Sequence, residues 1–215
     1  MEEVEIDSLR KAEIKRKTKE TEIGLRLLID GSGEAKIETG IPFLSHLLNL
    51  LTYNSLFDVE IVAKGDLCHH ITEDIGIALG SGLNEALGDK KGIRRYGQSL
   101  LPMDEALAMV AIDISGRPNL IMTGNLKALP FSGKSQSRSH LNLSGTVDGF
   151  DVSLISEFLK AFVDNAKLTL HITLFYGKDT HHLIEAIFKG MGRALRIACE
   201  LDERALDIPS TKGLL

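Results

Sequence analysis

The motif His-His-x-x-Glu occurs twice in the sequence, and it offers side chains that could bind a metal. One copy begins at His69 and the other at His181. Residues three and four apart lie on the same face of a helix, so the glutamate of each motif would lie beside both of its histidines. Imidazole nitrogen and carboxylate oxygen together suit divalent metals such as manganese, iron and zinc. Each motif is therefore a candidate metal site.

An internal repeat connects the two motifs. When the sequence is shifted by 112 residues, seven of the 18 positions in 69–86 become identical, and His69 falls on His181. One inserted residue also pairs His46 with Glu157. Such self-similarity predicts a duplicated structure. Two metals with four protein ligands each would use all eight candidate ligands, which are His46, His69, His70, Glu73, Glu157, His181, His182 and Glu185.

Further side chains could complete a site for an anionic substrate. The neighbouring histidines of each motif point in different directions, so we expect each pair to serve two metals, shared between halves of the chain or between subunits. Lys189 follows Glu185 by four residues, and it would either pair with that carboxylate or reach a substrate anion. Each other cation is by itself more often a surface charge. Together, cations and a hydroxyl could clamp a phosphate; these groups are Arg94, Arg95, Arg117, Ser210 and Lys212.

The composition is that of an ordinary globular chain. The 215 residues are 43% hydrophobic and 26% charged, which excludes disorder, collagen and coiled coil. A net charge of −5 and the absence of Trp argue against nucleic-acid binding. No apolar run approaches the length of a membrane helix, and the acidic N-terminus does not resemble a signal peptide. We therefore expect a cytoplasmic protein that binds neither nucleic acid nor membranes.

Helices must position these side chains, and the hydrophobic periodicity of the sequence predicts where the helices lie. Apolar residues at helical spacing predict helices that begin at Pro42 and cover 69–87, 152–163 and 181–200. Alternating apolar residues predict strands over 22–29, 57–63, 106–114 and 168–175. The turn Asp30–Gly33 predicts that 35–39 returns as the hairpin partner of the first strand. The segment 124–139 is expected to be a long loop.

Several segments resemble imidazoleglycerol-phosphate dehydratases of histidine biosynthesis. The resemblance covers the chain from about Lys17 to Leu215, and the motifs follow the order found in that family. They are Thr39–His46, Pro102–Leu107, Ser115–Pro118, His181–Lys189 and Pro209–Gly213.

The resemblance implies an α/β fold of the α+β sandwich type. It implies one domain built of two pseudo-repeats, about 17–100 and about 101–204, with a tail over 205–215. Each half would be a four-stranded sheet packed by two helices. The family further implies a homo-oligomer, a 24-mer built from trimers, with active sites between subunits. Each active site would hold two Mn²⁺ ions, although other divalent metals are possible.

The resemblance also assigns roles to residues. All eight candidate ligands match the metal ligands of the family, and six positions match its contacts to the phosphorylated imidazole substrate. Those six are Glu20, Arg95, Arg117, Lys189, Ser210 and Lys212. The implied reaction is dehydration of imidazoleglycerol phosphate to imidazole-acetol phosphate. It removes a proton from carbon, and we expect Glu73 or Glu185 to move that proton.

Two other functions would use the same ligands. A dinuclear hydrolase of phosphate esters would activate water with them, and a metal-binding assembly would have no activity.

The chain also departs from the family pattern, because Glu157 replaces a histidine found in many members and Ser45 replaces the usual aspartate. Of the remaining histidines, we expect His171 to be structural and hydrogen-bonded, and His140 to be exposed.

Overall fold

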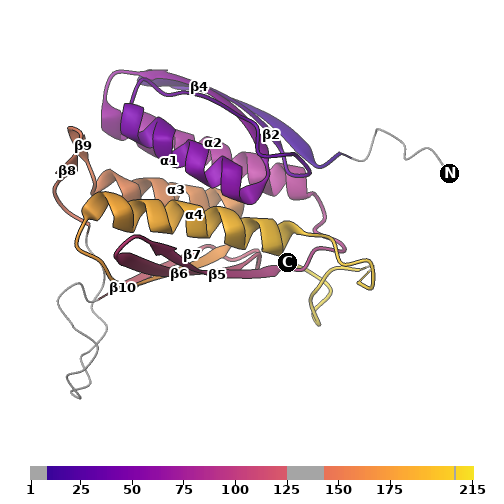
Figure 1. Cartoon of the computed structure of the whole chain (residues 1–215). Coiled ribbons are helices and arrows are strands. Elements are labelled where there is room, and N and C mark those ends of the chain that lie inside the picture. The colour runs from indigo at the N-terminus through magenta and orange to yellow at the C-terminus, as the bar shows by residue number, and fades with distance from the viewer. Residues whose placement is uncertain (1–8, 125–142, 206) are drawn as a thin grey trace, which may run out of the picture.

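Two sheets enclose four long helices in the computed structural model of this chain (Figure 1). The structure describes residues 9–124, 143–205 and 207–215. The two sheets form the outer layers, and the helices pack between them in two layers that face each other. None of the helices in the described residues is long and apolar enough to cross a membrane. The predicted loop over 124–139 and His140 lie outside the described residues, apart from Gly124 at the end of a strand.

The first half of the chain forms one sheet and two helices. Its strands pair in the order β1-β2-β4-β3, and only the pairing of β3 with β4 is parallel. The elements are β1 (Lys11–Lys17), β2 (Thr21–Leu28), β3 (Ala35–Glu38), α1 (Pro42–Ser55), β4 (Asp58–Gly65) and α2 (Cys68–Leu87).

The second half repeats this arrangement. Its order β5-β6-β10-β7 again places one parallel strand at the edge, here β7 beside β10. The elements are β5 (Tyr96–Met103), β6 (Ala106–Asp113), β7 (Asn119–Gly124), α3 (Leu154–Ala166), β10 (Thr169–Tyr176) and α4 (Thr180–Cys199). A small hairpin of β8 (Thr146–Val147) and β9 (Phe150–Asp151) is added before α3. The duplicated α/β fold is thus confirmed, and the second sheet begins at Tyr96, a few residues before the repeat boundary predicted near 101.

The predicted hairpin between the first strand and residues 35–39 is wrong. β3 pairs with β4, on the far side of β4 from β2. The chain from 30 to 34 crosses the end of β4 instead of turning back, because Oδ1 of Asp58 accepts the N–H groups of Ser32, Gly33 and Glu34 at 2.8–3.0 Å. Strands β1, β5 and β7 were not predicted, and no more than two residues of each are buried, so none of them shows the full alternation of a half-buried strand.

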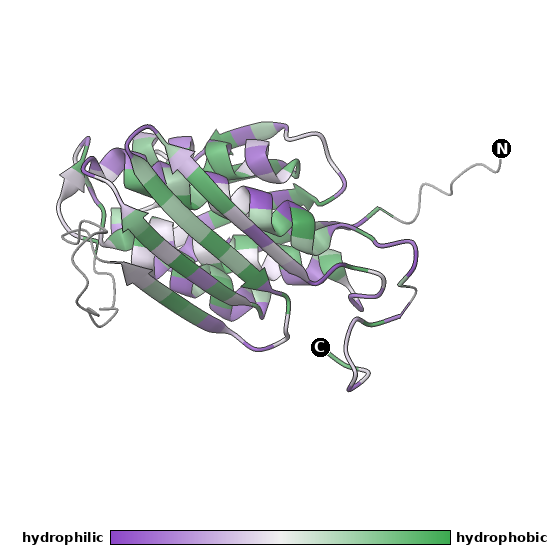
Figure 2. Cartoon of the chain, turned by 60° about the horizontal axis from the view of Figure 1, so that its bottom comes forward, coloured by the Kyte–Doolittle hydropathy of each residue, from purple (hydrophilic) through white to green (hydrophobic). Residues whose placement is uncertain are grey.

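Alternating burial places one face of each sheet against the helices. In β6, every second residue from Ala106 to Ile112 is buried, and the residues between them are half-buried. Figure 2, which brings the second sheet forward, shows the corresponding bands of hydrophilic and hydrophobic residues along its strands. The helices cover only the inner face, so the outer face of this sheet has no partner within the described chain.

Glycines let the helix layers approach each other closely. Gly80 on α2 lies where a Cβ atom would overlap the carbonyl oxygen of Phe162 on α3. Gly192, its partner in the 112-residue repeat, lies in the same way against the carbonyl oxygen of Leu51 on α1. The helices therefore pair as α2 with α3 and α1 with α4, which joins the two halves of the chain.

Candidate metal centre

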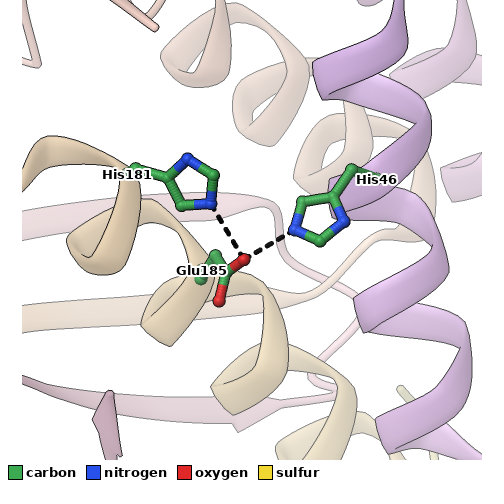
Figure 3. Close-up of side chains that lie close together, drawn as sticks. All are labelled: His46, His181 and Glu185. Atoms are coloured by element: carbon green, nitrogen blue, oxygen red, sulfur yellow. Dashed lines mark hydrogen bonds and ion pairs between the residues drawn. The ribbon is translucent and has the colours of Figure 1, made fainter. Parts of the chain in front are cut away.

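Three predicted ligands converge where α1 meets α4. Nε2 of His46 lies 2.6 Å from Oε1 of Glu185, and Nε2 of His181 lies 3.0 Å from the same oxygen (Figure 3). The three ligand atoms lie within 4.8 Å of one another. Glu185 projects from α4 between the two rings, one of which comes from the other half of the chain. This is the one group of potential metal ligands that the described residues bring so close together.

Local sequence explains why these side chains lie there. Pro42 at the first position begins α1 and places His46 in the second turn. Asp179 caps α4, because its Oδ1 accepts the backbone N–H of His181 at 2.8 Å. Phe43 packs beside both imidazole rings, with centroid distances of 6.5 Å to His46 and 5.3 Å to His181. The motif histidine is thus fixed at the start of its helix.

Glu185 is a buried carboxylate that stays ionised. Burial raises its pKa, but hydrogen bonds from Lys189, His46 and His181 lower it more strongly, to about 2. Nζ of Lys189 lies 2.6 Å from Oε2, so the pairing considered from the sequence is present in the chain. Two imidazole nitrogens around one ionised carboxylate form a donor set that suits a borderline divalent cation. These residues therefore fit a metal.

The first copy of the motif does not gather a matching set within one chain. Nε2 of His69 lies 3.6 Å from Oε2 of Glu73, and both side chains are about half exposed. Glu157 is exposed on the first turn of α3 and makes no hydrogen bond or ion pair with the described residues. Of the eight predicted ligands, three thus form the cluster at α1 and α4, and the other five lie outside it.

The second histidine of each motif has other partners than the first. The two rings of a motif are nearly perpendicular, at 88° for His69 and His70 and at 82° for His181 and His182. Nδ1 of His70 lies 2.8 Å from Oδ1 of Asp66 and 3.7 Å from Oε2 of Glu20. The two histidines of a motif thus have different partners, and the expectation that each pair serves two metals stays a prediction.

Carboxylates that the sequence analysis did not single out hold these two histidines. Nδ1 of His182 lies 2.7 Å from Oε2 of Glu105. The N–H of Asp179, the ring of His182 and the N–H of Lys178 lower the pKa of Glu105 to about 2. The spacing of four residues between Asp66 and His70 could have predicted their contact. Glu105 is 77 residues from His182, and the only signal for it in the sequence is its place in the segment Pro102–Leu107, which resembles the family.

The predicted phosphate clamp lies at the other end of α4. Arg95 binds Asp113 with two nitrogens, at 2.7 and 3.2 Å, and donates to the carbonyl oxygen of Pro209 at 2.9 Å in the tail. Its own N–H bonds to the carbonyl oxygen of Ala198. At 1.5 Å per helical residue, Ala198 is about 25 Å from His181 along the axis. The tail beside Arg95 also carries Ser210 and Lys212, and its last residue lies against Gly116, next to Arg117.

One histidine prediction is wrong. His171 is exposed on β10 and forms no hydrogen bond with the described residues. Its side chain faces the outer side of the sheet, which the helices do not cover, so none of the described residues fixes it.

Comparison with known proteins connects this site to one family. Residues 39–195 match the family model described as imidazoleglycerol-phosphate dehydratase. Relatives with that name include those of Bacillus licheniformis and Bacillus subtilis, 51% and 50% identical over 210 residues, which cover 96% of this chain and 100% of each relative.

Solved structures agree in fold. A crystal structure of imidazoleglycerol-phosphate dehydratase from Staphylococcus aureus superposes with a TM-score of 0.75 at 41% identity, covering 89% of this chain and 99% of that one. The structure of the IGPD from Pyrococcus furiosus in complex with (S)-C348 superposes with a TM-score of 0.76 at 35% identity, covering 94% and 100%.

Proposed function

The chain belongs to the imidazoleglycerol-phosphate dehydratase family, and from this premise we propose which of its residues perform the reaction. The protein is a hydro-lyase that dehydrates imidazoleglycerol phosphate to imidazole-acetol phosphate in histidine biosynthesis. The family is metal-dependent, and the described residues contain a possible metal site.

We assign one divalent metal, Mn²⁺, to His46, His181 and Glu185. The observation that carries the assignment is the convergence of two Nε2 atoms on one buried, ionised carboxylate. The repeat relates these ligands to Glu157, His69 and Glu73, which we assign to a second Mn²⁺. His70 and His182 contact other carboxylates, Asp66 and Glu105, so we expect them to complete the sites together with another copy of the chain.

The distance along α4 supports an active site shared between copies. Arg95 lies beside Ala198, about 25 Å along α4 from His181, and the tail that carries Ser210 and Lys212 lies at the same end, with its last residue against Gly116, next to Arg117. A small phosphorylated imidazole cannot span that distance within one chain. We therefore propose that the clamp of one copy holds the phosphate of a substrate bound at the metal cluster of another, in a homo-oligomer of 24 copies built from trimers in the cytoplasm.

The described residues support a division of chemical roles. A bound divalent metal would supply Lewis acidity and a template at the imidazole of the substrate. Lys189 fixes the carboxylate of Glu185, and its ammonium adds positive charge beside an anionic substrate. Glu20 lies near His70, at the same end of the helices as the motifs. Glu73 has a freer carboxylate than Glu185, which three donors hold, so of the two candidates for proton transfer Glu73 is better suited to accept the proton.

The function is tested by the reaction itself. Purified protein with imidazoleglycerol phosphate and Mn²⁺ is expected to release water and form the ketone product, and to lose activity on chelation. Release of inorganic phosphate instead would indicate the hydrolase, and metal binding without turnover would indicate the inactive assembly.

The shared site is tested by mixing two inactive variants. His46→Ala removes a metal ligand, and Arg95→Ala removes a clamp residue, so each variant alone should be inactive. Mixed oligomers, co-expressed with different tags and purified through both, would contain some sites with an intact cluster and an intact clamp. If the two parts come from different copies, random mixing restores roughly a quarter of the sites. Mixed oligomers without activity would contradict the proposal.

A further inference from the structure

Glu105 connects three groups at the start of α4. It lies in the two-residue turn between β5 and β6, next to Asp104, which has a positive φ of 46°. Its Oε1 accepts the N–H groups of Lys178 at 3.0 Å and Asp179 at 2.8 Å. Its Oε2 lies 2.7 Å from Nδ1 of His182. The carboxylate is therefore anchored by backbone donors on one side and faces an imidazole with the other.

This geometry determines which nitrogen of His182 carries the proton. An ionised carboxylate can only accept, so Nδ1 of His182 must be the donor. In the neutral ring, the other nitrogen, Nε2, then carries the lone pair, which is the form in which imidazole binds a metal. Nε2 lies 3.6 Å from Oδ2 of the largely exposed Asp104.

The duplicated half contains the same relationship, built from a different residue. Nδ1 of His70 faces the carboxylate of Asp66 at 2.8 Å. Glu20, which lies in the equivalent turn between β1 and β2, is farther away at 3.7 Å. In both halves, therefore, a carboxylate close to Nδ1 holds the proton there, so that the neutral ring of the second motif histidine has its lone pair on Nε2. In the second half this carboxylate belongs to Glu105 in the turn. In the first half it belongs to Asp66, four residues before His70.

We propose that Glu105 is a positioning residue that holds His182 in the tautomer whose Nε2 binds metal, with Asp66 in the same role toward His70. This inference rests on the proposed function, in which His182 is a metal ligand. Partners of this kind fix ring orientation and basicity, and their loss typically lowers metal affinity about 10- to 100-fold.

The variant Glu105→Gln separates orientation from folding. An amide oxygen can still accept the N–H groups of Lys178 and Asp179. The amide NH₂ would face His182, so it donates to Nδ1 and places the proton on Nε2, where it blocks the metal. We expect the affinity for Mn²⁺, measured by the electron paramagnetic resonance of free Mn²⁺, to fall about 10-fold or more. Thermal unfolding measured with a chelator should change little, and Glu105→Asp should restore part of the affinity.

Two further variants make the outcome decisive. Glu85→Gln, an exposed glutamate near the end of α2, should bind Mn²⁺ as the unmodified protein does. His182→Ala should lose affinity at least as strongly as Glu105→Gln. If His182→Ala loses Mn²⁺ and Glu105→Gln does not, the positioning role is overturned and the proposed ligand set stands. If neither variant loses Mn²⁺, the assignment of His182 as a ligand fails.

Discussion

Glu185 on α4 contacts His46 on α1 across the boundary between the two repeats, with Oε1 2.6 Å from Nε2. The two residues are 139 positions apart in the sequence. Their contact places the candidate metal site at the packing interface of the halves, beside the close approach of Gly192 to α1. A metal bound there would link the two halves as well as contribute to catalysis.

Replacing Glu185 with glutamine tests its role as ligand and as proton carrier. The amide lacks the charge that attracts a cation and leaves Lys189 without its anionic partner. We expect Mn²⁺ affinity to fall at least about 10-fold, and, because Glu73 is the proposed proton acceptor, turnover at saturating metal to fall by less than the roughly 100-fold that loss of a general base costs. Mn²⁺ titration and the dehydration rate at saturating metal measure the two effects. Normal turnover in Glu185→Gln would remove this residue from proton transfer, and Glu85→Gln is the matched control.

Glu157 can be tested by substitution in two directions. Glu157→Ala should reduce the bound Mn²⁺ from two ions per chain to one, because we propose Glu157 as a ligand of the second metal. Glu157→His restores a ligand of the type found in many relatives, so it should keep both ions. Metal analysis after dialysis gives the stoichiometry. Two tightly bound ions in Glu157→Ala would show that Glu157 is not a ligand.

Glycines at the helix contacts should not tolerate a side chain. A methyl group at Gly80 or Gly192 would overlap a carbonyl oxygen of the neighbouring helix. Alanine favours helix by about 1 kcal/mol over glycine, but overpacking costs about 1–3 kcal/mol and rigid backbone atoms cannot yield. We expect both variants to lower the thermal midpoint of unfolding. Gly24→Ala is the control, because nothing lies within 4 Å of its added Cβ.

The stability contributed by Asp58 should depend on pH. Burial raises the pKa of Asp58, but the N–H groups of Glu34, Ser32 and Gly33 together lower it below its ordinary value of 3.8. A lowered pKa in the folded state means that the contribution is present above pH 3.8 and is lost as the pH falls through the folded value.

Asp58→Ala should therefore reduce the free energy of unfolding at pH 7 by about 1–3 kcal/mol, with a smaller difference near pH 3. Urea denaturation at the two values measures it. Glu60→Gln, which removes an exposed ion pair with Arg26, should have little effect at either pH. An equal loss in Asp58→Ala at both values would contradict the role of the ionised carboxylate.

The sequence by itself determined the helices, the repeat and the types of ligand. Apolar residues at helical spacing encode one buried face, and that signal is local, so α1, α2, α3 and α4 were predicted within a few residues. The identity of Gly80 with Gly192 was visible, and its reason is the helix contact that both make. The family followed from motifs that keep their order along the chain, and the matching family model confirms it.

Only the tertiary structure decided which of these residues meet. No local pattern states that β3 pairs with β4, since that pairing depends on α1 crossing the sheet and on Asp58 holding the chain between β2 and β3. Likewise, His46 meets Glu185 because α1 packs on α4, and Arg95 lies far from both because α4 separates its two ends by its own length. Contacts between distant segments depend on how whole surfaces fit together, and periodicity along one segment does not record that fit.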